Sequence, residues 1–203
     1  MNQQQNSRSE TNRQKILSAA GKFFWQKGYI ATSIDDIAGA AKMNKASIYY
    51  YFENKAAILH ELGTTTLQAM IDQALPVVNS SLTAEKKMEL FVTNHTQFLL
   101  RHLDLTGIGY KERKHLPRRL FQIYIGLRDE YEGMFRRILQ EGMEQGVFAC
   151  QVPKLSSLLI MGLLNSTLQW FKPTGKYSSD DVALEICAMV LKSLNVTQES
   201  LKP

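Results

Sequence analysis

The sequence predicts an all-α protein built from a short helical head and a longer helical body. No stretch alternates apolar and polar residues as a half-buried strand does, and the apolar residues recur at helical intervals of three and four. The composition agrees, because 44% of the 203 residues are hydrophobic and 21% are charged, which suffices to build a core. The two cysteines lack C-x-x-C spacing and are expected to be reduced and packed.

The first helix is expected to run for about four turns and to end near Gly28. Its apolar stripe consists of Ile16, Leu17, Ala20, Phe23 and Phe24. The polar residues before this stripe include Arg13 and are interpreted either as a solvated tail or as an arm that reaches a DNA backbone.

Two short helices are predicted within residues 32–55. Ser33 is placed to cap the first, Asp36 completes a capping box, and Asn44 is placed to cap the second. Lys42 falls in the tight turn between them. The inward positions are Ile37, Ala38, Ala41, Ile48 and Phe52. This is helix-turn-helix spacing, and the outward positions that can meet DNA are Lys45, Ala46, Ser47, Tyr49 and Tyr50.

Longer helices follow. One begins near Asn54 and is expected to stop at Pro76, because proline disrupts a helix interior. Gly107 and Gly109 are expected to break the pattern between two later helices, and Pro153 is expected to start another. The later apolar faces run from Met88 to His102, from Leu120 to Ile138, from Leu155 to Phe171 and from Val182 to Leu194.

Positive charge is concentrated at the N-terminal end. Residues 1–60 hold 8 Lys and Arg against 4 Asp and Glu, and the rest of the chain holds 16 against 15. This balance is typical either of a polyanionic partner such as nucleic acid or of a solvated face. No secretory pattern is present, and residues 155–171 are polar-interrupted and short of the roughly 20 residues of a membrane span. We therefore expect a cytoplasmic protein without a membrane partner.

Signals of catalysis are weak. Gly107 and Gly109 form a lone glycine pair, and the G-x-S-x-G and H-E-x-x-H motifs are absent from the sequence. His95 and His102 share a helical stripe without a nearby carboxylate or cysteine at ligand spacing, so packed histidines are expected. We predict no catalytic residue, metal site or cofactor. The competing hypothesis is a helical enzyme or scaffold that uses the helix-turn-helix for protein contacts only.

The N-terminal motifs resemble the tetracycline-repressor (TetR) family of bacterial transcription regulators. The matching residues are Ile16-Leu17-x-x-Ala20, Phe24, Gly28-Tyr29, Thr32-Ser33-Ile34-x-x-Ile37-Ala38 and Ile48-Tyr49-x-Tyr51-Phe52-x-Asn54-Lys55-x-x-Ile58. Two positions depart from the family, which commonly has glycine at Lys42 and often at Ala46. At Lys42 the backbone must then be left-handed at a cost or be shaped differently.

The resemblance implies a homodimeric, ligand-responsive regulator, commonly a repressor released from a palindromic operator. It implies a DNA-binding domain at residues 10–70 and a divergent domain for effector binding and dimerisation at residues 76–196. Phosphate contacts are implied for Ser33, Tyr49 and Lys55, and approach to base edges is implied for Lys45, Ala46, Ser47 and Tyr50. Tyr51 is left between core packing and DNA contact.

The body offers two further hypotheses. The helix 155–171 is apolar nearly all round and, with the helix 182–194, predicts a four-helix dimer interface. The segment 111–119 holds five Lys and Arg and is either a solvated surface or a binding site for the phosphates of an effector such as an acyl-coenzyme A thioester. The sequence from Asn165 to Gly175 also resembles members of the family that sense such thioesters. The candidate effector-binding residues, for an apolar or acyl-bearing small molecule, are Arg118, Arg119, Tyr124, Tyr131 and Trp170.

Overall fold

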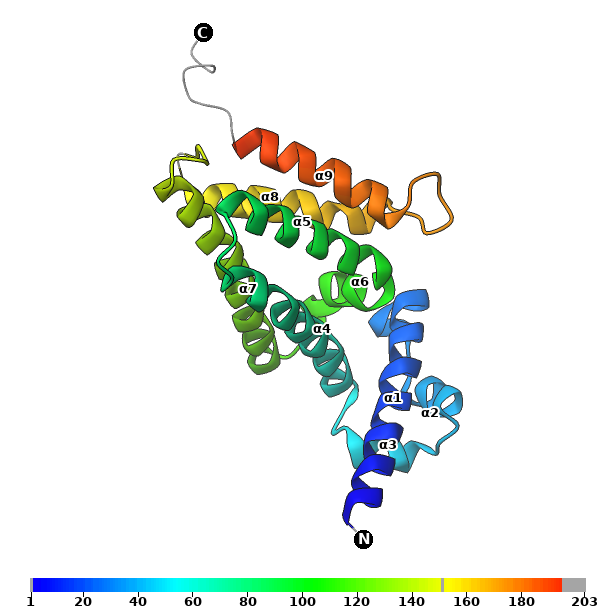
Figure 1. Cartoon of the computed structure of the whole chain (residues 1–203). Helices are drawn as coiled ribbons and strands as arrows, with labels where there is room; N and C mark the ends of the chain where they lie inside the picture. The colour runs from blue at the N-terminus through cyan, green and yellow to red at the C-terminus, as the bar shows by residue number, and fades with distance from the viewer. Residues whose placement is uncertain (1, 151, 195–203) are drawn as a thin grey trace. The chain divides into compact units, whose positions relative to one another are not determined.

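A computed structural model describes residues 2–150 and 152–194, with side chains from residue 9 onward. The described chain is all-α, as predicted, and contains no strand (Figure 1). Its helices are α1 Asn2–Ala31, α2 Ile34–Ala41, α3 Lys45–Tyr51, α4 Lys55–Val78, α5 Ala84–Arg101, α6 Leu103–Glu112, the 3₁₀ helix η1 Arg113–His115, α7 Arg118–Glu144, α8 Pro153–Trp170 and α9 Ser179–Leu194.

The residues group into two compact units. The head unit comprises residues 1–66 and 104–125, and the body unit comprises residues 67–103 and 126–203, as far as the structure describes them. The expected division of the sequence at 10–70 and 76–196 stays a prediction, and its residues 195 and 196 lie outside the described chain. The segment 104–125, which lies far along the sequence from the helix-turn-helix, groups with the head unit.

The core of the head unit forms where α1, α2 and α3 meet. The apolar stripe of α1 is buried together with the inward faces of the two short helices and the first turns of α4. The completely buried side chains here are Ile16, Ala20, Ile37, Ile48 and Ile58. These are the positions that helical periodicity assigns to the interior, so the hydrophobic pattern fixes how the helix-turn-helix is presented.

Two predicted helix boundaries are wrong. The helix α1 begins at Asn2 instead of near the apolar stripe. Its regular backbone does stop at Gly28, as predicted, because φ there is 82° and the helix is kinked. Pro76 does not stop α4, which continues to Val78. Proline removes one backbone donor, but the chain recovers because Asn79 N donates to the carbonyl of Leu75 at 3.1 Å.

Gly107 and Gly109 do not break the helical pattern. Both lie buried inside α6, where they allow close packing within the head unit. A Cβ atom on Gly107 would lie 2.4 Å from the ring of Trp25, and one on Gly109 would lie 3.4 Å from the hydroxyl of Tyr124. Each glycine therefore makes room for a side chain from elsewhere in the sequence. Because the sequence pattern around the glycines does not show these contacts, it is interpreted as a helix break.

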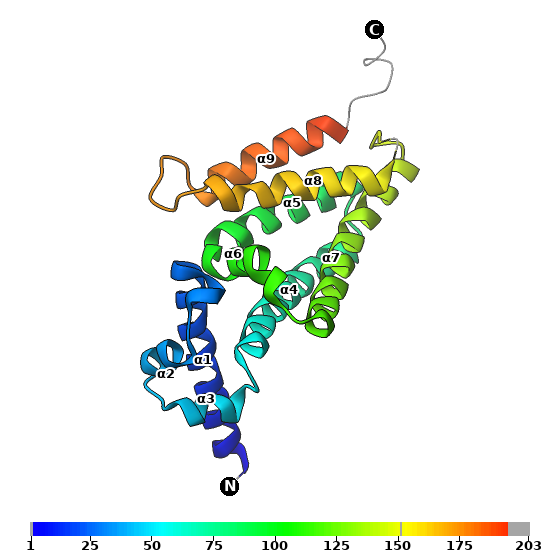
Figure 2. The same ribbon diagram turned by 180° about the vertical axis from the view of Figure 1, so that it is seen from behind.

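In the body unit, α5 packs against both α8 and α9. The helices α8 and α9 lie side by side, as both views show (Figures 1 and 2). The apolar cluster between these helices and α7 includes Phe91, Phe135, Ile138, Leu164 and Val190. Two ion pairs, each with one buried member, lie at its edges: Lys87 Nζ is 2.8 Å from Glu141 Oε2, and the exposed Lys154 Nζ is 2.6 Å from the buried Glu132 Oε2. No helix of the described chain has the length and apolar character that a membrane span requires.

The two histidines of the α5 stripe differ in their surroundings. His95 is packed in the core as predicted, whereas His102 is exposed at the C-terminal end of α5 beside the ring of Phe98. Across the described residues, no group of three metal-ligating side chains comes together. Both cysteines are free thiols, Cys187 buried and Cys150 partly so.

Candidate nucleic-acid interface and effector pocket

Local hydrogen bonds build the helix-turn-helix. The hydroxyl of Ser33 accepts from Asp36 N at 3.0 Å, and the Asp36 carboxylate accepts from Ser33 N at 2.8 Å, which completes the predicted capping box. These bonds and the neighbouring Lys27 ammonium lower the pKa of Asp36, with the bond from Lys27 as the largest cause. Asn44 caps α3, because its Oδ1 accepts from Ser47 N at 2.7 Å. Both short helices thus start where the sequence predicts.

The turn between α2 and α3 is left-handed at Lys42, with φ 56° and ψ 44°. Met43 N donates to the carbonyl of Ala38 at 2.9 Å, which closes the end of α2. A non-glycine residue in this conformation costs about 1 kcal/mol. The chain therefore keeps the sharp turn of a helix-turn-helix with lysine in place of glycine.

The helix α3 presents its polar face to solvent. Ile48 and the following Phe52 are buried, whereas Tyr49 and Tyr50 are 48% and 81% exposed. Lys45 and Ala46 are also exposed, and Ser47 is half-buried. An α-helix with its side chains is about 10–12 Å across, which fits the roughly 12 Å wide major groove of B-DNA, and α3 has seven residues. The side chains proposed for base contact thus share the outward side of one helix.

Several of these side chains already have partners. Lys45 Nζ lies 2.8 Å from Asp35 Oδ2 of α2, and this hydrogen bond raises the pKa of Lys45. The hydroxyl of Ser47 donates to Asn44 Oδ1 at 2.9 Å, and the hydroxyl of Ser33 donates to Asp36 Oδ2 at 2.7 Å. Contact with DNA would exchange these exposed bonds for bonds to phosphate or base atoms.

Lys55 has a different environment from the other candidates. Its ammonium donates to the carbonyls of Tyr29 and Thr32 at 2.7 and 2.6 Å, and more weakly to that of Ile30 at 3.4 Å. It also lies 4.3 Å from the centre of the Tyr29 ring. Partial burial lowers the pKa of Lys55. The ammonium therefore closes the C-terminal end of α1 onto the start of α4, and phosphate contact by Lys55 stays a prediction.

Arg13 belongs to neither a solvated tail nor a DNA-reaching arm. It lies on α1, donates from Nε to Glu61 Oε1 at 2.6 Å and from Nη1 to the carbonyl of Tyr51 at 3.1 Å, and stacks 4.4 Å from the Phe52 ring centre. Tyr51, half-buried, receives a further hydrogen bond on its hydroxyl from Asn12 at 3.2 Å. These contacts anchor the end of α3 to α1, which sequence spacing could not indicate.

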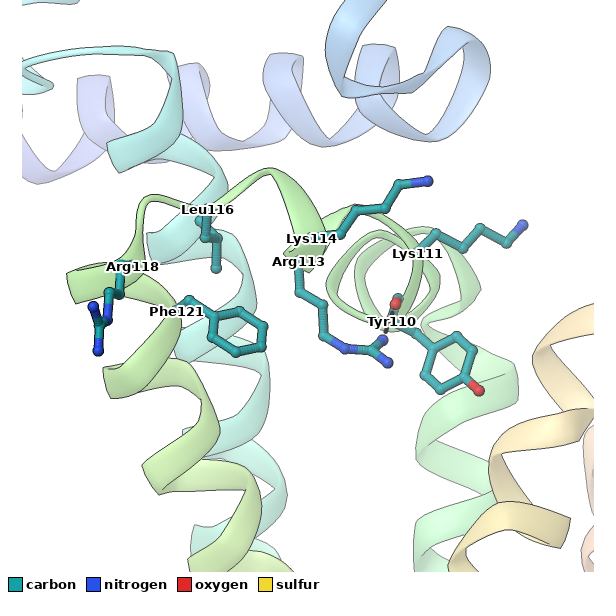
Figure 3. A pocket seen from close by; sticks show the side chains of 7 residues that line it. All are labelled: Tyr110, Lys111, Arg113, Lys114, Leu116, Arg118 and Phe121. Carbon is teal, nitrogen blue, oxygen red and sulfur yellow. Dashed lines mark hydrogen bonds between the residues drawn. The ribbon is translucent and has the colours of Figure 1, made fainter.

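The basic segment forms a pocket of about 540 Å³ within the head unit (Figure 3). Four cationic side chains line it: Lys111, Arg113, Lys114 and Arg118. Tyr110, Leu116 and Phe121 supply its aromatic and apolar part. Arg119, the neighbour of Arg118, is exposed and is not among the lining residues. Of the two arginines proposed from the sequence, the structure brings only Arg118 to this pocket.

The other effector candidates lie in separate surroundings. Tyr124 is buried in the head unit and donates to the carbonyl of Gly109 at 3.2 Å. Tyr131 is buried in the body unit, where its hydroxyl lies 3.1 Å from His95 Nδ1, and burial raises the pKa of this phenol. Trp170, at the end of α8, is 53% exposed. None of these three aromatic residues is among those that line the basic pocket.

Sequence reasoning missed the polar partner of Tyr131. His95 is 2% exposed, and its Nε2 has no hydrogen-bond partner. Burial lowers the pKa of His95 to about 3, so the imidazole is neutral. The only sequence signal at His95 is its seven-residue spacing from His102. That spacing relates two residues of α5, whereas the partner of His95 is Tyr131 on α7.

The surface of α8 and α9 remains strongly apolar. Leucine and methionine side chains that face solvent on these helices are Leu155, Leu158, Leu159, Leu163, Leu184 and Met189. Leu155, Leu159 and Leu163 recur every fourth residue and so form a continuous stripe on α8. An exposed apolar stripe of this length is typical of a protein interface.

The comparisons with known proteins cover both ends of the chain. The family description "Bacterial regulatory proteins, tetR family" matches residues 16–62, and "Tetracyclin repressor-like, C-terminal domain" matches residues 81–194. The HTH-type transcriptional repressor KstR2 of Rhodococcus jostii is 25% identical over 184 residues, which is 90% of each chain.

Solved structures share the fold. The TetR family transcriptional regulator PfmR from Thermus thermophilus superposes with a TM-score of 0.83 at 29% identity, covering 89% of this chain and 99% of that one. AibR, crystallised in complex with isovaleryl coenzyme A and operator DNA, superposes with a TM-score of 0.81 at 20% identity, covering 88% and 97% of the two chains.

Proposed function

The chain belongs to the TetR family of bacterial regulatory proteins and is a ligand-responsive, DNA-binding transcriptional repressor, and we propose that it reads its operator through α3. The observation that carries this proposal is the outward face of α3, which presents Lys45, Ala46, Ser47 and Tyr50. The opposite face of the same helix is anchored by the buried Ile48. A lysine can donate to guanine acceptors, and an alanine methyl can contact a thymine methyl.

The remaining candidates of the head surround this face. Ser33 stands at the start of α2 and Tyr49 on α3, and both carry hydroxyls suited to phosphate oxygens. Lys55 supports the interface by holding the end of α1 against the start of α4. Phosphate contacts fix the register of a protein on the duplex, while base contacts specify the sequence.

The protein acts as a homodimer. We propose that α8 and α9 of two copies form a four-helix interface through the apolar stripe described above. A two-fold dimer has two recognition helices, so its operator is palindromic with half-sites about one DNA turn, or 34 Å, apart. We propose that the DNA-binding domain is residues 10–70, the effector and dimerisation domain residues 76–196, and the site of action the cytoplasm, where the DNA is.

We propose an acyl-bearing effector with an anionic group. AibR binds isovaleryl coenzyme A, as its complex shows, and the basic pocket of the present chain suits an anionic group of this kind. A repressor is released only if its effector binds the DNA-incompetent state more tightly, and operator DNA must then weaken effector binding by the same factor. The relatives are regulators, and we propose that this chain is likewise no enzyme.

Replacement of Lys45 by alanine is expected to reduce discrimination between operator and random DNA. A good base contact is worth about 1 to 3 kcal/mol, or roughly 5- to 150-fold in affinity. Binding is measured by fluorescence anisotropy on DNA from upstream of the protein's own gene. Asp35→Asn is the matched control, because it frees the same ammonium without removing it and should bind operator at least as tightly as the wild type. An equal loss on operator and random DNA would contradict base contact by Lys45.

Replacement of Lys55 by alanine is expected to weaken binding to operator and random DNA alike. The carbonyls of Tyr29 and Thr32 lose their donor, so the thermal stability of the chain should fall as well. Titrations at several salt concentrations separate the two roles. A slope reduced by about 1 means that the ammonium also meets phosphate, and an unchanged slope restricts it to support of the helix ends. Unchanged affinity and stability would remove Lys55 from both roles.

A further inference from the structure

The basic pocket of the head unit has the chemistry of a nucleotide site. Resting on the proposed function, which requires an acyl-bearing effector with an anionic group, we propose that this pocket binds the phosphorylated nucleoside portion of that effector. The pocket is built from one continuous segment, in which the end of α6, the helix η1 and the first turn of α7 follow each other. Its volume of about 540 Å³ falls within the range of small-molecule sites.

The charge of the pocket is uncompensated. No carboxylate is among its lining residues, and Lys114 and Arg118 have no hydrogen-bond or ion-pair partner among the described side chains. The nearby Glu112 lies instead within 3.4 Å of His115 Nε2. Four like charges around one hollow repel each other, and an anion relieves that repulsion. Arginine also offers a planar pair of donors to phosphate oxygens.

The aromatic residues point to a flat ring in the ligand. The ring of Tyr110 is partly exposed and carries the Arg113 guanidinium 4.7 Å from its centre, while Arg113 Nη1 donates to the Tyr110 carbonyl. Phe121 is half-buried and its ring projects from α7 into the pocket (Figure 3). A nucleobase stacked on an aromatic side chain contributes about 1 to 3 kcal/mol.

The layout selects among anions. Figure 3 shows Leu116 and Phe121 between Arg118 on one side and Arg113 with the two lysines on the other. A fatty acid carries one carboxylate and no flat ring, so it satisfies only one side of this arrangement. A nucleoside with phosphates at two positions places a ring over the apolar part and charge on both sides. Coenzyme A carries such a group, as does free adenosine 3′,5′-bisphosphate.

The pocket segment is also in direct contact with α1 inside the head unit. Lys111 Nζ lies 4.8 Å from the ring centre of Trp25, and the ring of His115 stacks on Tyr29 at 5.5 Å. The carbonyl of Tyr29 in turn accepts the hydrogen bond from Lys55 at the start of α4. A ligand that reorders this segment therefore acts on the residues that seat the helix-turn-helix.

The experiment compares ligands with and without the nucleotide. Binding of octanoyl-coenzyme A, the octanoyl thioester of N-acetylcysteamine, and adenosine 3′,5′-bisphosphate is measured by calorimetry, and operator release by anisotropy. The test variant is Lys114→Ala/Arg118→Ala, with Arg118→Ala alone as a milder version. Arg119→Ala is the matched control, since it removes an equivalent exposed charge outside the pocket. Circular dichroism melts verify that each variant is folded.

The wild type is expected to bind the coenzyme A thioester at least about tenfold more tightly than the short thioester, an advantage of about 1.4 kcal/mol. The double variant should lose this advantage while binding the short thioester normally, and Arg119→Ala should retain it. If both thioesters bind and release the operator equally well in every variant, the nucleotide site is refuted and the proposed function stands.

The bisphosphate separates the remaining outcomes. If no thioester binds but the bisphosphate does, and the double variant abolishes that binding, the pocket is a nucleotide site and the acyl part of the proposed function is wrong. If neither the thioesters nor the bisphosphate binds, the nucleotide site and the acyl effector both fail. DNA binding through α3 is unaffected by any of these results, because it is measured without a ligand.

Discussion

Replacement of Leu159 by glutamate is expected to convert the dimer into a monomer and to abolish tight operator binding. Leu159 is 65% exposed on α8, in the stripe that also holds Leu155 and Leu163. In a two-fold interface the substitution places two carboxylates in an apolar contact, each without a partner. Burying unpaired charge and juxtaposing like charges costs several kcal/mol. The dimer dissociation constant should therefore rise by at least about 100-fold.

Light scattering measures the outcome directly. The wild type should have a mass near 46 kDa, about twice the 23.1 kDa of one chain, and Leu159→Glu should have the mass of one chain at micromolar concentration. Operator affinity should fall with it, because a monomer presents one recognition helix in place of two. Leu82→Glu is the control, since Leu82 is an exposed leucine of the body unit that lies on neither α8 nor α9. A dimeric Leu159→Glu variant with wild-type operator affinity would show that the two chains meet elsewhere.

The helix-turn-helix could be predicted from sequence because its determinants are local. Ser33 and Asp36 are three residues apart, and Asn44 caps a helix whose first turn it adjoins, so each start signal lies within one turn of its effect. Burial of Ile37 and Ile48 follows from periodicity alone. The tight turn at Lys42 is likewise predicted from the residues, and its left-handed backbone is one of the two alternatives that the resemblance to the family leaves open.

The features that failed depend on contacts between distant residues. Gly107 is interpreted from sequence as a helix break. The structure shows that it leaves room for the ring of Trp25, a residue some eighty positions earlier in the chain. The sequence shows Arg13 only as part of a polar stretch. The structure shows that it donates hydrogen bonds to Glu61 and to the carbonyl of Tyr51. The basic segment is already proposed from the sequence as a phosphate site, and the structure adds that Tyr110 and Phe121 line its pocket whereas Arg119 does not. The hydrophobic pattern predicts which face of a helix is buried, but it does not predict which residues of other elements pack against that face.

His95 is expected to make the free energy of unfolding depend strongly on pH. Its pKa is lowered to about 3 by burial, whereas an unfolded histidine has a pKa of about 6.5. Below about pH 6.5 the unfolded chain binds a proton at this imidazole that the folded chain does not bind. The free energy of unfolding contributed by this group is therefore fully present above about pH 6.5 and is lost as the pH falls toward 3, by up to about 1.4 kcal/mol per pH unit.

The double variant His95→Phe/Tyr131→Phe is expected to remove this dependence. It deletes the buried Nε2 that has no partner together with the hydroxyl 3.1 Å from Nδ1, and replacing both members of a buried polar pair by apolar rings of similar shape is nearly neutral or stabilising. Urea unfolding should thus give similar stabilities for the variant and the wild type at about pH 7.5, and a variant more stable by about 2 kcal/mol at about pH 5. Tyr131→Phe alone keeps the buried imidazole and should keep the wild-type dependence, because burial and not the phenol causes the shift in pKa. Parallel pH profiles for the wild type and the double variant would mean that His95 takes up its proton in the folded protein, with water or a neighbouring group reaching the imidazole inside the body unit.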